Sequence, residues 1–192
     1  MGYLIAPAAG FAFGVADQYL GSRSALGAWA AVVSLVSAPW LLIGFVGGLT
    51  QSVARRAMIV AVLVTVPALL GYFTMTCSPM EGVALARFPQ CFSTISRTGY
   101  NPLWILGAVF LAPLYGLLGH RWRVARSWTS AVVVAGTLCL EPLAHLSFDP
   151  WMISAAPVVW WAEVTSGLVL TAVLARGIAM SRRATGALPP AF

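Results

Sequence analysis

The sequence has very few charged residues and no lysine. Charged side chains make up 8% of its 192 residues, the hydrophobic set makes up 60%, and the mean hydropathy is +0.88. A soluble domain averages about 25% charged residues, so this chain has too little charge to keep a water-facing surface soluble. The deficit excludes a soluble globular protein. It predicts an all-α, polytopic membrane protein that forms a single transmembrane domain over residues 1–192.

The chain also lacks the motifs of several enzyme classes. It has no Walker phosphate-binding loop, no GxSxG nucleophile elbow, no HExxH zinc motif and no Cys-x-x-Cys redox pair. Its two histidines, His120 and His145, are separated by a predicted helix, so they do not indicate a metal site. We therefore predict neither a metal ion nor an organic cofactor.

Six apolar runs are each long enough to cross a bilayer, which takes about 20 mostly apolar residues per helix. They are residues 3–20, 26–49, 57–75, 102–119, 128–147 and 155–176. The first run has no basic residue before it and contains Asp17, so we interpret it as a helix of the mature protein rather than a cleaved signal peptide. The pattern predicts a bundle of six transmembrane helices.

The basic residues are all arginines, and most of them lie in the connections between the apolar runs. Arginine-rich connections face the cytoplasm, so this distribution places both termini on the cytoplasmic side. It encodes topology rather than a basic groove, and we expect no nucleic-acid partner despite the net charge of +6. Arg87 and Arg97, in the loop 76–101, oppose this orientation. The clusters that support it are Arg55 and Arg56, then Arg121, Arg123 and Arg126, then Arg176, Arg182 and Arg183.

The loop over residues 76–101 contains two of the three cysteines, Cys77 and Cys91. If this loop is extracytoplasmic, the two thiols lie in an oxidising compartment and we expect them to form a disulfide. Closing a loop of this size contributes about 3 kcal/mol in the chain-entropy treatment. The alternative is a pair of free thiols.

Three of the five acidic residues, Asp17, Glu141 and Glu163, lie inside predicted membrane helices. A charged carboxyl at the centre of such a helix costs about 2.5–3.5 kcal/mol, so these side chains usually face a bundle interior or a wet cavity. Their positions along the helices agree in depth, and His145 lies one turn from Glu141 on the same face. We predict that all three carboxyls face one cavity in the outer half of the bundle, where burial favours the protonated form.

Aromatic side chains are expected at the same depth. The candidate walls of a pocket are Phe13, Tyr19, Tyr72, Trp104, Trp160 and Trp161, together with His145. The alternative is an interfacial belt of aromatic rings, which membrane proteins commonly have. A belt accounts for Trp104 more readily than for Trp160 and Trp161, because these two lie deeper and beside a carboxyl.

In size, helix number, intramembrane acids and aromatic content, the chain resembles the small bacterial integral-membrane terpene cyclases of the drimentine type, which cyclise the prenyl chain of prenylated indole compounds. The resemblance implies that Asp17, Glu163 or Glu141, in that order of preference, protonates an alkene. Aromatic faces would then stabilise the cation. It also implies a lipophilic prenylated substrate that arrives through the membrane lipids, no cofactor, and a location in the bacterial plasma membrane.

Two other functions fit the same residues. Intramembrane Asp, Glu and His side chains are the usual parts of proton relays, so a small proton-coupled transporter or channel is one alternative. A weak internal repeat of three helices, inverted in the membrane as in many transporters, favours this class. The other alternative is a structural membrane subunit whose acids form hydrogen bonds between helices.

Overall fold

The fold was analysed in a computed structural model, which describes residues 2–99, 101–148 and 155–186. Throughout this part of the chain the regular structure is helical and no strand occurs, which confirms the prediction of an all-α fold. The helices are α1 (Gly2–Gly21), α2 (Ala28–Val33), α3 (Ala38–Leu49), α4 (Ala54–Thr76), α5 (Phe88–Ile95), α6 (Asn101–Ala125), α7 (Trp128–Phe148) and α9 (Pro157–Gly186). Short 3-10 turns occur at Ser24–Leu26, Pro79–Glu81 and Leu85–Arg87.

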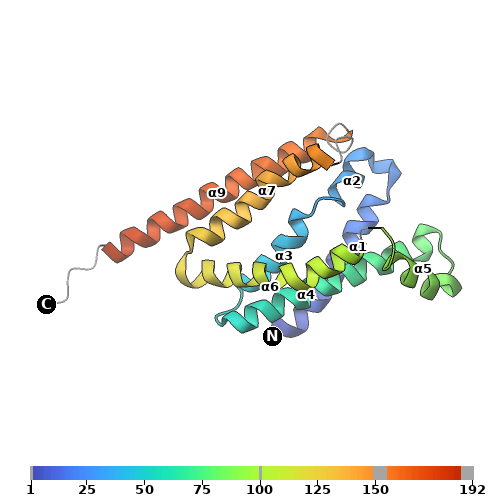
Figure 1. Ribbon diagram of the computed structural model, residues 1–192, viewed down its shortest axis with the longest axis horizontal. Helices are drawn as coiled ribbons and strands as arrows, with labels where there is room; N and C mark the ends of the chain where they lie inside the picture. The colour runs from blue at the N-terminus through green and yellow to red at the C-terminus, as the bar shows by residue number, and fades with distance from the viewer. Residues whose placement is uncertain (1, 100, 149–154, 187–192) are drawn as a thin grey trace.

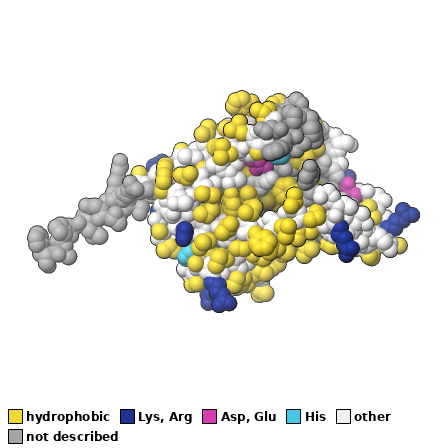
Figure 2. Space-filling model, in the orientation of Figure 1, with side chains coloured by type: hydrophobic (Ala, Val, Ile, Leu, Met, Phe, Trp, Pro, Cys, Tyr) yellow, Lys and Arg dark blue, Asp and Glu magenta, His cyan; other side chains and the backbone are white. Residues whose placement is uncertain are grey.

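Four segments within these helices are long and apolar enough to cross a membrane. They match the last four predicted spans and are Ala54–Thr76, Asn101–Ala125, Trp128–Leu146 and Pro157–Gly177. Large hydrophobic side chains are exposed along them and along α1, as expected for surfaces that face lipid rather than water. In Figure 2, hydrophobic side chains cover the middle of the visible face and arginines gather towards its two ends.

The prediction of one continuous helix over residues 26–49 is wrong. Here α2 ends at Val33, and α3 begins only at Ala38. Ser37 is the N-cap residue of α3, and Pro39 lies in its first turn, where the missing N–H of proline costs nothing. A serine just before a proline is an ordinary helix-start signal, but the uninterrupted apolar run concealed it.

The helices form two groups that α3 and α2 connect (Figure 1). In one group α1 packs along α4 and α4 along α6; in the other, α7 and α9 form a hairpin. Helix α3 packs against α4 and α6, and it also contacts α7. The hairpin is therefore attached to the rest of the protein through α6 and through the broken helix α2–α3.

Glycines allow the closest approach between helices, as the spacing of Gly10 and Gly14 suggests. A Cβ atom on Gly14 would lie 1.8 Å from the carbonyl oxygen of Ala68, and one on Gly10 would lie 1.9 Å from that of Val64. Both contacts are with α4. Helix α1 is thus held against α4 by direct backbone contact, which leaves no room for a larger residue.

The loop over residues 76–101 is more structured than a simple connection, since it contains α5 and two 3-10 turns. Cys77 and Cys91 lie at disulfide distance, with their Cα atoms 5.8 Å apart, which confirms the predicted pair. The Ser22 hydroxyl donates a 2.6 Å hydrogen bond to Glu81, whose carboxylate also lies 3.8 Å from the Arg23 guanidinium. The loop is thereby fastened to the turn after α1.

Substitution of Gly14 by alanine is expected to lower the free energy of unfolding by about 1–3 kcal/mol, because the new methyl group collides with the backbone of α4. Thermal unfolding of the purified protein in detergent measures this. Gly136→Ala is the matched control, since a Cβ atom at that helical glycine meets nothing within 4 Å. Equal loss of stability in both variants would contradict the packing of α1 on α4.

The disulfide is expected to appear as one Cys77–Cys91 peptide in non-reducing mass spectrometry of the protein purified from membranes. Cys77→Ser combined with Cys91→Ser should lower the free energy of unfolding by about 3 kcal/mol. Cys139→Ser, which changes the one free cysteine, is the control. Free thiols at both positions would show that the loop does not reach an oxidising compartment.

Candidate functional site

The structure divides the three intramembrane carboxyls into two groups. Asp17 and Glu141 are each 9% exposed and Glu163 is 7% exposed, so the prediction that all three are buried is confirmed. Glu141 and Glu163 lie together. Within the described part of the chain, Asp17 interacts instead with Trp40 and Tyr72. The prediction of one shared site is therefore wrong for Asp17.

The first group joins α1, α3 and α4 around Asp17. Trp40 is the side-chain hydrogen-bond partner of the Asp17 carboxyl, and the Tyr72 side chain lies close enough to feel its charge. Phe13, one turn before Asp17, packs edge-on against Trp40 at 5.3 Å, and Trp40 packs edge-on against Tyr72 at 5.9 Å between ring centroids. Oδ2 of Asp17 is buried and has no hydrogen-bond partner among the described residues.

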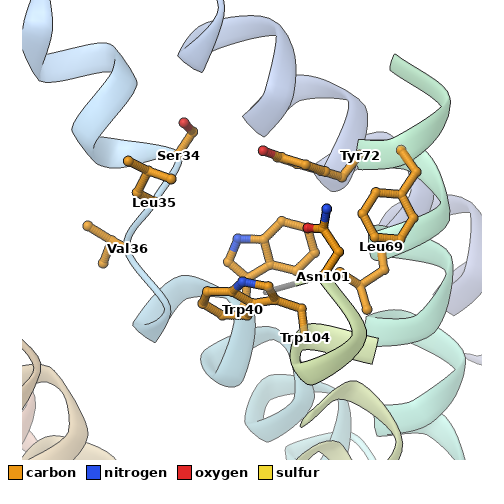
Figure 3. Close-up of a pocket in the computed structure, with 9 residues that line it drawn as sticks. Ser34, Leu35, Val36, Trp40, Leu69, Tyr72, Asn101 and Trp104 are labelled. Carbon is orange, nitrogen blue, oxygen red and sulfur yellow. The ribbon is translucent and has the colours of Figure 1, made fainter. Parts of the chain in front are cut away.

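A cavity of about 60 Å³ lies against this group. Figure 3 shows Tyr72 and Trp104 on its α4 and α6 sides, with the amide of Asn101 projecting between them and Trp40 across the floor. Asp17 itself does not line the cavity; it is hydrogen-bonded to one wall, Trp40, and interacts electrostatically with another, Tyr72. The lining residues are Ser34, Leu35, Val36, Trp40, Leu69, Tyr72, Phe73, Asn101 and Trp104.

The second group is centred on Glu141 of α7, whose carboxylate caps the start of α3. Its two oxygens accept hydrogen bonds from the backbone N–H groups of Ser37 and Ala38, the latter at 2.7 Å. The Ser37 side chain forms no cap of its own. The first N–H groups of a helix lack partners within the helix, and the positive end of its dipole attracts an anion. Glu141, which belongs to another helix, therefore supplies the hydrogen-bond acceptors that the first N–H groups of α3 lack locally.

Glu163 of α9 completes the second group. Its carboxyl interacts with that of Glu141, and neither of its oxygens has a hydrogen-bond donor among the described residues. Nε2 of His145 lies 3.6 Å from Oε1 of Glu141, and the imidazole packs on the Trp160 ring with centroids 5.1 Å apart. Of the side chains that the sequence predicts at one depth, the structure thus brings Glu141, Glu163, His145 and Trp160 together.

No family model, curated protein or solved structure matches this chain. The site must therefore be interpreted from its own geometry. Among the described residues no group of three or more His, Cys, Asp or Glu side chains is placed to hold a metal ion.

The structure places the residues predicted as pocket walls at different positions relative to the cavity. Tyr72 and Trp104 line the cavity, Phe13 packs behind it on Trp40, and Trp160 is buried beside the glutamates. The structure does not place Trp161 or Tyr19 on this cavity. Trp161 is 72% exposed and lies about 100° around α9 from Trp160, whereas the Tyr19 ring is covered by the Arg23 guanidinium, 4.2 Å from its centroid.

Sequence reasoning missed Trp40 and the segment 34–36. Both line the cavity because the second membrane segment is broken there. The helix-start signal at Ser37 and Pro39 could have located the break and would have placed Trp40 in the first turn of a new helix.

Glu141→Leu is expected to lower the free energy of unfolding by at least about 1–3 kcal/mol, because it leaves two backbone N–H groups unpaired away from water. Glu141→Gln keeps one acceptor oxygen and should lose less. Thermal unfolding in detergent compares the two variants with the wild type. A Glu141→Leu variant as stable as the wild type would show that the cap contributes nothing.

Proposed function

We propose that the chain is a membrane-bound terpene cyclase that protonates and cyclises the prenyl chain of a lipophilic, prenylated aromatic or indole substrate. The observation that carries this proposal is the buried carboxyl of Asp17 against the aromatic rings of Trp40 and Tyr72, which line a cavity. A carboxylic acid supplies the proton, and ring faces stabilise a cation without reacting with it.

The proposed reaction is balanced without a cofactor. The O–H proton of Asp17 adds to one carbon of an alkene, whose π electrons form the new C–H bond and leave a tertiary cation. A second alkene of the same chain then attacks this cation and forms the C–C bond of the ring. Loss of a proton from the last cation forms an alkene and returns the proton to the carboxylate of Asp17, so the product is an isomer of the substrate.

Asp17 is a better proton donor for this chemistry than the two glutamates. Both oxygens of Glu141 accept backbone hydrogen bonds, and the carboxyl of Glu163 faces Glu141. Asp17 has one oxygen without a hydrogen-bond partner among the described residues, and it interacts with two walls of the cavity, Trp40 and Tyr72. In the proposal Trp40, Tyr72 and Trp104 are the rings that stabilise the cation.

The substrate has to open the cavity, because 60 Å³ is far below the roughly 300–1,000 Å³ of typical ligand sites. In the proposal, the wall that moves is the segment 34–36 between α2 and α3, in which the N–H groups of Leu35 and Val36 form only i→i−3 turn hydrogen bonds. Leu35 and Trp104, both about two-fifths exposed, form the rim. We propose that a prenyl chain enters between them from the lipid.

We also propose six passes across a bacterial plasma membrane. Helix α1 and the discontinuous pair α2–α3 would add two passes to the four long apolar helices. The arginine clusters favour cytoplasmic termini. The Cys77–Cys91 pair supports an extracytoplasmic position for the loop 76–101 and for the end of the bundle that holds the carboxyls.

A small proton-coupled transporter is the second candidate. The observation that favours it is the break between α2 and α3 beside buried Glu141, Glu163 and His145, since transporters often bind their substrate or coupling ion at a discontinuous helix. Reconstitution in proteoliposomes separates the two candidates. A transporter gives solute-coupled proton flux, which a cyclase does not.

Asp17→Asn is expected to reduce conversion of a linear prenylated indole to its cyclic isomer by at least about 100-fold, since an amide cannot protonate an alkene and general acid catalysis contributes about 10²–10⁴-fold. Trp40→Leu should reduce conversion less, because it removes a cation-stabilising ring but keeps the acid. Conversion by membranes that contain each variant is followed by chromatography and mass spectrometry.

The control is Trp161→Leu, which changes an exposed tryptophan that does not line the cavity and should leave the conversion rate unchanged. Thermal unfolding of each variant checks that lost activity is not lost folding. Full activity in a folded Asp17→Asn variant would exclude Asp17 as the acid. Absence of conversion by the wild type across prenylated aromatic and indole substrates would reject the proposed function.

A further inference from the structure

The carboxyl of Glu163 lies in a buried environment where a negative charge would be costly. Its side chain is 7% exposed, and neither oxygen has a donor within the described residues. An ionised carboxylate buried without a partner is far too costly to persist. Something must therefore neutralise this group.

The titratable groups packed around Glu163 come from α7 and α6. On α7, the Glu141 carboxyl faces Glu163, and His145 lies 3.6 Å from Glu141. On α6, the Tyr115 hydroxyl is hydrogen-bonded to Thr137 of α7. No arginine forms an ion pair with either glutamate in the described part of the chain.

Glu141 and Glu163 are not equivalent. Glu141 accepts two backbone N–H groups at the positive end of α3, an arrangement that favours a charged carboxylate. Glu163 has no hydrogen-bond donor among the described residues. A hydrogen bond between two carboxyls requires that one of them carries a proton, and this asymmetry places the proton on Glu163.

We propose that Glu141 and Glu163 form a proton-binding site in which the Glu163 hydroxyl donates to the Glu141 carboxylate. Two carboxyls in contact in a medium of low dielectric constant share one proton because both cannot be charged. The hydrogen bond to a charged acceptor is a strong one. The site is separate from Asp17 and does not depend on the proposed cyclase activity.

The bound proton has a structural consequence. Glu163 on α9 holds Glu141 on α7, and Glu141 holds the N-terminus of α3. Three segments are thus joined through one proton at the break that also forms a wall of the cavity. Loss of the proton would leave two carboxylates that repel each other, and the α7–α9 hairpin would then be held less tightly to α2–α3.

A monovalent cation such as Na⁺ could neutralise the pair in place of a proton. The positive end of α3 points at Glu141 and disfavours a second positive charge there. The structure therefore favours the proton, and the experiment includes Na⁺ as an alternative.

A hydrophobic carbodiimide, which reacts with protonated carboxyls inside membranes, tests the site in the whole wild-type protein. Peptide mass spectrometry should find the adduct on Glu163 and not on Glu141 at neutral pH. Labelling should fall about tenfold for each pH unit above its midpoint, as expected for one bound proton. Replacing choline chloride with NaCl at constant pH should change nothing. Protection of Glu163 from labelling by Na⁺ would show that the pair binds a metal cation and would overturn the proposed proton site.

Infrared spectroscopy gives a second measurement that needs no reagent to reach the site. Protonated carboxylic acids give a C=O stretch, and the component due to Glu163 should be lost in Glu163→Gln while the component due to Asp17 remains. Glu141→Gln should shift the pH profile of Glu163 labelling and leave that of Asp17 unchanged. The proposal is overturned if neither the adduct nor the band is found on Glu163, or if Glu141→Gln leaves the Glu163 profile unaltered. The wild-type results decide the presence of the proton even if a variant fails to fold.

Discussion

The start of α3 lies inside a chain that is otherwise committed to lipid, and its first N–H groups must find an acceptor there. In a bilayer no water can satisfy them, so a broken helix is tolerated only where other parts of the protein supply the partner. Glu141, more than 100 residues away in the sequence, accepts the N–H groups of Ser37 and Ala38. The break in the second membrane segment and the attachment of the α7–α9 hairpin therefore depend on the same carboxylate.

This capping contact also shapes the surroundings of the buried acids. Because the helix breaks at residues 34–37, Trp40 lies in the first turn of α3 and is hydrogen-bonded to Asp17, while residues 34–36 become a cavity wall. The acids then have different surroundings. Glu141 accepts backbone hydrogen bonds and interacts with Glu163, whereas Asp17 has one oxygen without a hydrogen-bond partner among the described residues. The helix break thus lies beside the glutamate pair, and the proposed function uses the other acid, Asp17.

Much of the fold is predictable from the sequence. There is a physical reason why the rest is not. Apolar length located the last four spans, and the loop chemistry identified Cys77 and Cys91. Burial of Asp17, Glu141 and Glu163 followed from their rarity in apolar runs. The sequence alone could not say that Asp17 lies with Trp40 rather than with the glutamates, or that Trp161 faces outward. Those outcomes depend on which helices become neighbours. The break before α3 was missed because the long apolar run predicted one continuous helix despite the helix-start signal at Ser37.

Hydrogen–deuterium exchange at the backbone of residues 34–42 tests most directly whether Glu141 holds the broken helix together. In the wild type, the amides of Ser37 and Ala38 should exchange slowly, because both are hydrogen-bonded to a buried carboxylate. In Glu141→Ala they should exchange much faster, while peptides from α1 and α4, which pack by direct backbone contact, keep their protection. Unchanged protection of residues 34–42 in a folded Glu141→Ala protein would contradict the account.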